Sequence, residues 1–452
     1  ASGDPSPHGA VLWTRLAPSP LEGGGLPPEV YKVRWEVAAD ENMRQVVQRG
    51  VEFATPALGH SVHVELQGLK PDRWYWYRFS VGDAQSPVGR TRTTPAVHQL
   101  PDRLRFAFAS CQHFESGLFT AYQHMAAADL DLVIHLGDYI YEGAGQEQKI
   151  RKHQGAEIVS LDDYRNRHAQ YKTDPHLQAA HASFPWLVVW DDHEFDNNCA
   201  GCISEESDVS PEEFLVRRAN AYQAYYEHMP LRRRCLPRGP AMQLCRSIPF
   251  GRLAEFQMLD TRQYRSDQPN GDGKHPLTGG VFDSRGTMLG NKHERWHNAS
   301  MLPSPADDPK YSMDQWSGYD VARKRLVSFL AERRILNPVV LTGDIHSNWV
   351  NDVRVDFDRD DDATVATEFV GTSISSGGNG SQELELAASI QSANPFVRFH
   401  NRERGYVSCT VTPDSWQSDY QVVEYVDRPG APLITRRSFV VESGQPGAVA
   451  AS

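Results

Sequence analysis

The sequence predicts an all-β sandwich domain followed by a larger α/β domain. The first 97 residues consist of strand-like segments separated by turns. Because this stretch contains no helical pattern, we expect it to be all-β. After residue 98, apolar strands alternate with helical segments, which is typical of a parallel sheet. Several of these later strands run directly into Asp, His, Tyr or Cys. We therefore expect domains over residues 1–97 and 98–452, with a functional site at strand ends of the second domain.

The bulk composition argues against several functions. The 452 residues include 46 Lys and Arg against 58 Asp and Glu, which gives a formal net charge of −12. An acidic chain is a poor candidate for a nucleic-acid scaffold, which usually carries a basic patch. Its uninterrupted apolar runs are far shorter than the ~20 residues that cross a bilayer, so we expect no transmembrane segment. The chain begins at Ala1, which resembles the trimmed end of a mature protein.

The expected N-terminal domain consists of strands. Val62, Val64 and Leu66 alternate with polar neighbours, which is the period of a half-buried strand. Because no cluster of carboxylates or histidines occurs in this domain, we expect it to have a packing or orienting role. Its strands are expected at residues 10–15, 31–37, 44–54, 60–66 and 73–81.

The expected second domain alternates strands and helices. A strand, a helical pattern and a second strand over residues 104–137 give the β-α-β order of a parallel sheet. Residues 266–312 lack any period, so we expect them to form a loop that walls the site. Helices are expected at 117–128, at 161–183 in two pieces broken at Asp174-Pro175, at 211–228 and at 320–334. Strands are expected at 104–110, 130–137, 185–190, 253–259, 338–342, 365–371, 404–411 and 420–425.

Residues that can bind metal ions follow four of these strands. The carboxyl ends of strands in α/β sheets are where ligands bind, so side chains at these ends are expected to meet. Four such coincidences favour one shared metal site over solvated acidic loops. The residues are Cys111, Gln112 and His113 after strand 104–110, Asp138 and Tyr141 after 130–137, Asp192 and His193 after 185–190, and Asp344 and His346 after 338–342.

The residue types indicate a two-metal hydrolase. The Asp138 carboxylate can bridge two cations, and a Tyr141 phenolate would imply a hard ion such as Fe³⁺. Cys111 would add a thiolate ligand. Two metals lower the pKa of bound water and clamp the attacking and leaving oxygens of a phosphate ester. His193 is the expected residue to assist the leaving oxygen. Arg165 is a candidate phosphate fork, although a plain position on a helix surface is an equally good interpretation.

Several motifs resemble a known family. They are Gly137-Asp138-x-x-Tyr141, Asp191-Asp-His-Glu194, Gly343-Asp-x-His346, Ala109-Ser-Cys-Gln112, Phe184-Pro-Trp186, Leu259-Asp-Thr-Arg262 and Glu368-Phe-Val-Gly-Thr372. Together they resemble the metallophosphoesterase superfamily in its PhoD-type alkaline phosphatase variant, over most of the chain. The resemblance implies that the second domain is a layered α/β/β/α sandwich. It also implies an exported enzyme that cleaves phosphate monoesters and diesters at alkaline pH with Fe³⁺ and Ca²⁺. Zn²⁺ or Mn²⁺ would be the alternative metals.

The resemblance also assigns ligands. Cys111, Asp138, Tyr141 and Asp344 would surround iron, and Asp138, Asp192 and His346 would hold calcium together with Asn198. Asp192 is preferred to Asp191 because it directly precedes His193. A metal-bound hydroxide would then attack phosphorus. The family includes Ca²⁺-dependent phospholipase D-like enzymes, so phospholipid or nucleotide-derived diesters remain alternative substrates.

The six cysteines give a prediction about the cellular compartment. Cys199 and Cys202 are three residues apart, and Cys235 and Cys245 flank a short excursion rich in Gly and Pro. We expect two local disulfides, with Cys111 and Cys409 free, in a secreted, periplasmic or cell-wall-associated protein.

Two other classes of function fit the sequence less well. A non-catalytic, metal-clipped adhesion protein would use closed metal sites, whereas the residues here lie beyond strand ends. A thiol oxidoreductase would need Cys199 and Cys202 on a thioredoxin-like turn, which the preceding Asn197-Asn198 does not supply. An assay of phosphodiester hydrolysis with and without chelator separates these classes from a phosphoesterase.

Overall fold

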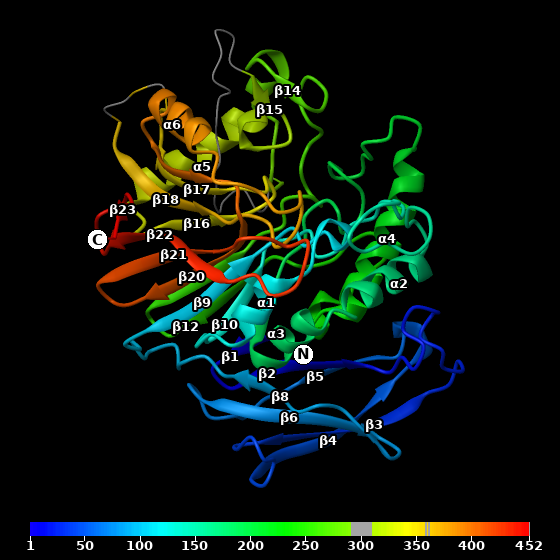
Figure 1. The fold of residues 1–452 in the computed structure, drawn as a ribbon. Coiled ribbons are helices and arrows are strands. Elements are labelled where there is room, and N and C mark those ends of the chain that lie inside the picture. Colours follow the sequence, from blue (N-terminus) through cyan, green and yellow to red (C-terminus); the bar gives the residue numbers. More distant parts are fainter. Residues whose placement is uncertain (291–309, 358, 360–361, 452) are drawn as a thin grey trace.

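The computed structural model describes the chain except for residues 291–309, 358, 360–361 and 452 (Figure 1). Its centre is a ten-stranded sheet in the order β23-β22-β21-β20-β9-β10-β11-β1-β2-β5. Strands β9 (Leu104–Ala109), β10 (Leu132–His135) and β11 (Pro185–Val188) run parallel in its middle, which confirms the predicted parallel arrangement. The strands on one side of them are β20 (Arg404–Val411), β21 (Ser415–Val423), β22 (Leu433–Glu442) and β23 (Val449–Ala450).

The sheet continues into the N-terminal region. Strand β1 (Ser2–Ser6) pairs in parallel with β11, and β2 (Gly9–Arg15) and β5 (Ser61–Glu65) follow it. A second sheet of this region contains β3 (Tyr31–Ala38), β4 (Val46–Ala54), β6 (Trp74–Val81), β7 (Ala84–Gln85) and β8 (Gly89–Arg92). Both sheets contribute side chains to one apolar cluster, which includes Leu12, Val37, Val62 and Tyr77. The N-terminal sandwich is therefore present, but one of its two layers is hydrogen-bonded to the sheet of the second domain.

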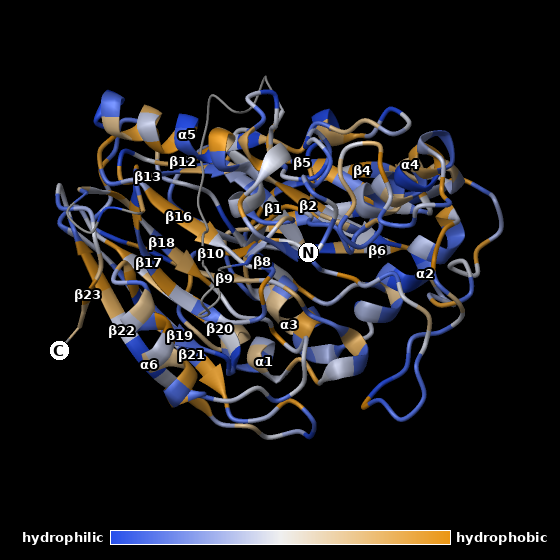
Figure 2. Cartoon of the chain, turned by 90° about the horizontal axis from the view of Figure 1, so that it is seen from above, coloured by the Kyte–Doolittle hydropathy of each residue, from blue (hydrophilic) through white to orange (hydrophobic). Residues whose placement is uncertain are grey.

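A four-stranded sheet is separate from the ten-stranded sheet. Its order is β16-β18-β17-β19, and β16 (Val339–Thr342) runs parallel to β18 (Thr364–Val370). The remaining two strands are β17 (Asn348–Arg354) and β19 (Val397–Asn401). A single bridge between Ser110 and Ser373 joins this region to the end of β9. In Figure 2, strands such as β2 and β16 are largely hydrophobic, whereas most connecting loops are hydrophilic.

Capping explains where the helices begin. Ser210 caps α4 (Pro211–His228) by accepting a hydrogen bond from the Glu213 backbone, and the Glu213 side chain returns to the Ser210 backbone. Ser160 and Asp163 form the same box on α2 (Leu161–Tyr171), and Asp174 caps α3 (Pro175–Ser183). The other helices are α1 (Thr120–Ala126), α5 (Asp320–Arg333) and α6 (Leu384–Ala393), and within the described residues no helix is long and apolar enough to cross a membrane.

The expected loop over 266–312 is only partly described. It contains short pairing between β14 (Lys274–His275) and β15 (Tyr311–Ser312), and the 3₁₀ turn Gly279–Phe282. Residues 291–309 lie outside the described part of the chain. Strands β12 (Arg246–Phe250) and β13 (Ala254–Met258) form a hairpin before this loop. Elsewhere in the described chain, the further 3₁₀ turns are η1 (Pro56–Leu58), η2 (Phe114–Ser116), η3 (Arg233–Cys235) and η5 (Trp316–Tyr319).

Candidate active site

The ends of β9, β10, β11 and β16 meet at one place. Three overlapping groups of side chains there have ligand atoms within 4.8 Å of one another. The groups are Cys111, Asp138 and His346; Asp138, Asp192 and His193; and Asp191, Asp192 and Asp344. Asp138 and Asp192 each belong to two groups, as expected for carboxylates shared between neighbouring cations. The structure thus brings together residues that are more than 200 positions apart in the sequence.

The backbone at these positions has an unusual conformation. Cys111, Asp138, Asn198, Asp344 and His346 all have positive φ, between 50° and 68°. Residues other than glycine rarely adopt this left-handed conformation, and such residues cluster at functional sites where the surrounding structure enforces them. Other residues of the chain, such as Met43 and Gln148, share this conformation, but five of the residues that have it lie at or beside the cluster.

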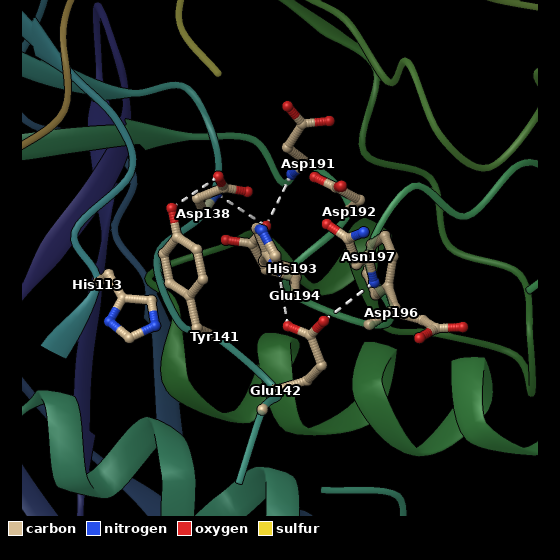
Figure 3. Close-up of polar contacts among 12 residues, drawn as sticks. His113, Asp138, Tyr141, Glu142, Asp191, Asp192, His193, Glu194, Asp196 and Asn197 are labelled. Carbon is tan, nitrogen blue, oxygen red and sulfur yellow. Dashed lines mark hydrogen bonds and ion pairs between the residues drawn. The ribbon is translucent and has the colours of Figure 1, made fainter. Parts of the chain in front are cut away.

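Tyr141 joins the first group through its phenol oxygen. Its Oη donates to Asp138 Oδ2 at 3.0 Å (Figure 3). The same oxygen lies 3.3 Å from His346 Nε2. Ser376 Oγ lies 2.8 Å from the same oxygen, accepts a hydrogen bond from the His113 backbone and donates to the Cys111 carbonyl. The glycine-rich turn after β18 therefore holds the phenol in place.

Asp192 is fixed by a neighbour that the sequence also suggested. Its Oδ2 accepts a hydrogen bond from the Asn198 backbone at 2.7 Å. The Asn198 side chain itself donates to Asp272 at 2.5 Å, in the described part of the 266–312 loop. Asn198 thus supports Asp192 through its backbone, and its amide links the cluster to that loop.

His193 is oriented by Glu142. Glu142 Oε2 lies 2.8 Å from His193 Nδ1, and its other oxygen accepts a hydrogen bond from the Asn197 backbone at 3.1 Å (Figure 3). The ring of Tyr141 packs on the imidazole with 4.1 Å between centroids. Burial acts to lower the pKa of His193, but the negative charges of Glu142, Asp138 and Asp192 outweigh it and raise the pKa well above its usual value.

The acidic side chains repel one another strongly in this buried place. Burial, together with the neighbouring carboxylates, raises the pKa of Asp138 and of Asp344 well above the usual range. Burial and nearby carboxylates also raise the pKa of the Cys111 thiol and of the Tyr141 phenol. By contrast, burial and Arg404 lower the pKa of His346 to about 4, which leaves its imidazole neutral. Bound cations would relieve this repulsion.

The cluster also contains a carboxylate oxygen without a partner. Asp138 Oδ1 is buried and accepts no hydrogen bond from the described residues, whereas Asp192 Oδ1 forms an ion pair with Arg262 Nη2 at 3.5 Å. Buried carboxylate oxygens of this kind are costly unless a cation or donor reaches them. Carboxylate, imidazole and thiol groups in one place suit metal ions, so the residues present fit a metal centre.

Comparison with known proteins agrees with this geometry. The model of PhoD-like phosphatases matches residues 106–307 and 298–420, and that of their N-terminal domain matches residues 1–95. Alkaline phosphatase D of Bacillus subtilis (strain 168) is 49% identical over 471 aligned residues, which cover 99% of this chain and 81% of that protein. The chain belongs to the PhoD-like phosphatase family.

The solved structure of PhoD matches the whole of this PhoD-like phosphatase. Its TM-score is 0.96 at 48% sequence identity, with 100% of this chain and 91% of that chain covered. The family membership establishes a metal-dependent phosphoric ester hydrolase. It also confirms a mixed, sheet-rich fold with an N-terminal domain of its own.

Arg165 is the one predicted site residue that this PhoD-like phosphatase does not bring to the cluster. Its Nε and Nη2 each donate to the Glu227 carboxylate at 2.7 Å, so the guanidinium joins α2 to α4. The Glu227 side chain is fully buried, and Gly59 of the N-terminal region lies beside the pair. The prediction of a phosphate fork is wrong, because the guanidinium is already engaged with a buried carboxylate at a contact between helices.

The predicted disulfides are also wrong in this structure. All six cysteines are free. Cys199 is buried while Cys202 is exposed, so the two side chains lie in different surroundings. Cys235 is likewise buried in its 3₁₀ turn, whereas Cys245 is partly exposed.

Two residues of the PhoD-like site, Arg262 and Glu194, were not assigned a role from the sequence. Arg262 forms two hydrogen bonds with Asp314, at 2.8 and 2.9 Å, and an ion pair with Asp191. Burial opposes the charge of Asp192, but Arg262 and His193 hold the pKa of that carboxyl below its usual value. Glu194 accepts hydrogen bonds from the backbones of Asp138, Tyr139 and Asp191 and so ties two ligand loops together. The signals were the Asp-Thr-Arg262 and Asp-Asp-His-Glu194 motifs, but the partners of these residues are distant in sequence.

Proposed function

We propose that this hydrolase uses Fe³⁺ and Ca²⁺, with Zn²⁺ or Mn²⁺ as the alternative, to cleave phosphate monoesters and diesters. The observation that supports this proposal best is the sharing of Asp138 between the group with Cys111 and His346 and the group with Asp192 and His193. Tyr141 adds a phenol to the first group, which suits a hard trivalent ion. Bound metals would supply an activated water molecule and neutralise charge on the phosphoryl group.

The chain's own residues have separate roles in this proposal. Cys111, Asp138, Tyr141 and Asp344 would hold iron, and Asp138, Asp192 and His346 would hold calcium. Asn198 supports Asp192 through its backbone and would be an additional calcium ligand. His193 would donate a proton to the leaving oxygen, since Glu142 holds its Nδ1 and leaves Nε2 facing the cluster. Through the cations that they would hold, Asp138, Asp192 and Asp344 would determine where the phosphoryl group binds relative to His193.

Elemental analysis of the purified protein tests the metals. We expect iron and calcium in the protein as isolated, loss of hydrolysis with a chelator, and its return when both ions are restored. Asp192→Asn should lower calcium content while Asp208→Asn, an exposed carboxylate with the same charge change, should not. An active protein that contains neither iron nor calcium would reject the assignment.

A second substrate class is favoured by one cavity. A mainly apolar cavity of about 770 Å³ lies between the sheets and reaches Asp191, Arg262 and Asp344. Trp190, Phe256 and Trp416 are among the residues that line it. A cavity of this size accommodates hydrocarbon chains, which supports a phospholipase D-like diester as the alternative substrate. Faster cleavage of phosphatidylcholine than of glycerophosphocholine would support this alternative, and the reverse order would reject it.

The proposal extends to architecture and location. We propose a layered α/β/β/α arrangement for residues 98–452, with residues 1–97 as an orienting domain. Packing of α5 on β17 and β18, and of α6 beside β19, supports an outer helical layer on the four-stranded sheet. A secreted, periplasmic or cell-wall location is proposed from the family resemblance. Cell fractionation followed by the phosphatase assay tests it.

A further inference from the structure

Arg404 carries a buried positive charge beside the site and has no role in the proposed reaction. It is the first residue of β20, and only 3% of its surface is exposed. The acceptors that its guanidinium contacts within the described residues are all uncharged. Buried charges are usually paired with an opposite charge, so this arrangement needs an explanation.

The guanidinium joins two turns that are distant in sequence. Nη1 donates to the His346 carbonyl at 2.7 Å, in the turn after β16, and Nε donates to the Gly378 carbonyl at 2.8 Å, in the turn after β18. Nη1 also donates to Thr372 Oγ1 at 3.3 Å. A β-carbon on Gly377 would lie 2.8 Å from Nη2, so the glycine leaves room for the planar group. The rigid fork of an arginine can hold several acceptors at once, which a lysine cannot do in the same way.

Both turns carry residues of the cluster. His346 has a φ of 51°, a conformation that residues other than glycine keep only where their surroundings enforce it. The hydrogen bond from Arg404 to the His346 carbonyl supplies such a restraint. Ser376 Oγ, in the second turn, lies 2.8 Å from Tyr141 Oη, and His346 Nε2 lies 3.3 Å from the same oxygen. Arg404 thus holds the two turns from which two neighbours of this phenol oxygen extend.

We propose that Arg404 is a positioning residue of the metal centre, which holds the His346 turn where the imidazole reaches the calcium ion. This inference rests on the proposed role of His346 as a calcium ligand. Groups that orient a metal ligand from behind typically contribute about 10- to 100-fold to metal affinity. The effect should fall on calcium more than on iron, because the main chain that Arg404 holds is that of a proposed calcium ligand.

Calcium titration of the iron-containing enzyme, after its calcium has been removed with EGTA, tests the proposal. Arg404→Lys keeps the charge, but a single ammonium group cannot reproduce the separate contacts to the His346 and Gly378 carbonyls. Its calcium Kd should rise about tenfold, while its iron content stays at the wild-type level. Saturating calcium should restore kcat, since Arg404 takes no part in the chemical step. Arg402→Lys, the same change at an exposed neighbour paired with Glu383, should leave the calcium Kd unchanged.

The other outcomes decide against the proposal. An unchanged calcium Kd in Arg404→Lys overturns it, and so does an equal loss of iron and calcium, because that indicates a general structural role. If Arg404→Lys does not fold, Thr372→Val removes one acceptor of the guanidinium at nearly constant volume and should raise the calcium Kd about threefold. An unchanged Kd in that variant overturns the proposal as well. A calcium Kd that is unchanged in His346→Ala is a different failure, because it rejects the ligand role of His346 on which the inference rests.

Discussion

Glu142 and His193 form a carboxylate–imidazole pair, with Glu142 Oε2 2.8 Å from His193 Nδ1. The carboxylate orients the ring and stabilises its positive charge. Glu142 and the other acidic neighbours raise the pKa of His193. The imidazole therefore stays charged at a pH above the usual pKa of histidine. A proton donor can therefore operate at alkaline pH.

The first prediction separates these two residues. His193→Ala should lower kcat about 10²-fold or more for alkyl phosphates and much less for nitrophenyl phosphate, whose leaving group needs little protonation. Glu142→Gln removes the negative charge, lowers the pKa of His193, and should move the alkaline decline of alkyl phosphate hydrolysis to lower pH. Measurement of kcat against pH for both esters checks this. An equal loss for both esters would argue that His193 acts in another way.

The second prediction concerns Tyr141 and Cys111. A phenolate bound to Fe³⁺ gives a visible charge-transfer band, so Tyr141→Phe should shift or remove the colour. Cys111→Ala should lower iron content, since the thiolate lies in the same ligand group as Asp138. Cys409→Ala, a buried free cysteine away from the cluster, is the control and should keep both colour and iron. A colourless wild-type enzyme with full activity would contradict the iron assignment.

The third prediction tests the corrected position of Arg165. Arg165→Ala leaves the buried Glu227 carboxylate without its main partner and should destabilise the fold by about 3 kcal/mol. Hydrolysis by the folded fraction should be unchanged. Arg78→Ala breaks the partly exposed pair with Glu36 and should cost about 1 kcal/mol or less. Urea unfolding measures both variants, and a large loss of kcat in folded Arg165→Ala would restore its role as a phosphate fork.

The fourth prediction concerns the buried lysine Lys172. Lys172 Nζ donates to Tyr139 Oη at 2.9 Å, and burial lowers the pKa of Lys172 to about 7. At a pH between 7 and 10.5, the ordinary pKa of lysine, Lys172 is protonated in the unfolded chain but not in the folded chain. The free energy of unfolding should therefore rise with pH in this range. The contribution is at most about 1.4 kcal/mol per pH unit.

Lys172→Met should flatten that rise, and the exposed Lys32→Met should not. Thermal midpoints at pH 7, 8.5 and 10 give the comparison. A midpoint that falls steadily from pH 7 to 10 in the wild type, and equally in Lys172→Met, would show that Lys172 does not control this dependence.

The fifth prediction follows from the cysteines. Six free thiols should react in the denatured protein without prior reduction, because the structure contains no disulfide among its six cysteines. Peptide mapping under non-reducing conditions gives the same information site by site. Detection of a Cys199–Cys202 or Cys235–Cys245 peptide would instead support the two local disulfides expected from the sequence.

Local sequence signals predicted the elements that local physics determines. The bounds of α4 follow from the Ser210 cap and Pro211, and those of β20 follow from its apolar pattern. Strand β1 was missed because Ser-Gly-Asp-Pro-Ser has no strand pattern and forms only by pairing with β11 and β2. Helix α6, which lies between two irregular segments, was missed as well.

The ligand set shows the same division. Asp138, Asp192, Asp344 and His346 could be found because each directly follows an apolar strand. Arg165 was misplaced because its partner Glu227 is on another helix, and nothing next to Arg165 indicates that pairing. The roles of Glu142 and Arg262 likewise depend on contacts across the fold, with His193 and Asp314. Side chains that work through distant partners are the ones that sequence alone leaves undetermined.

The place of β1 between β11 and β2 determines the order in which the chain can fold. Ser2 pairs with Pro185, so one edge of β1 stays open during synthesis until β11 has been made. An open strand edge is a template for pairing with other chains, and contacts between residues so far apart in sequence slow folding. The buried ion pair between Asp4 and Arg246 requires a still longer stretch of chain. The nascent N-terminal half therefore carries an unpaired strand edge until residue 185 has been made.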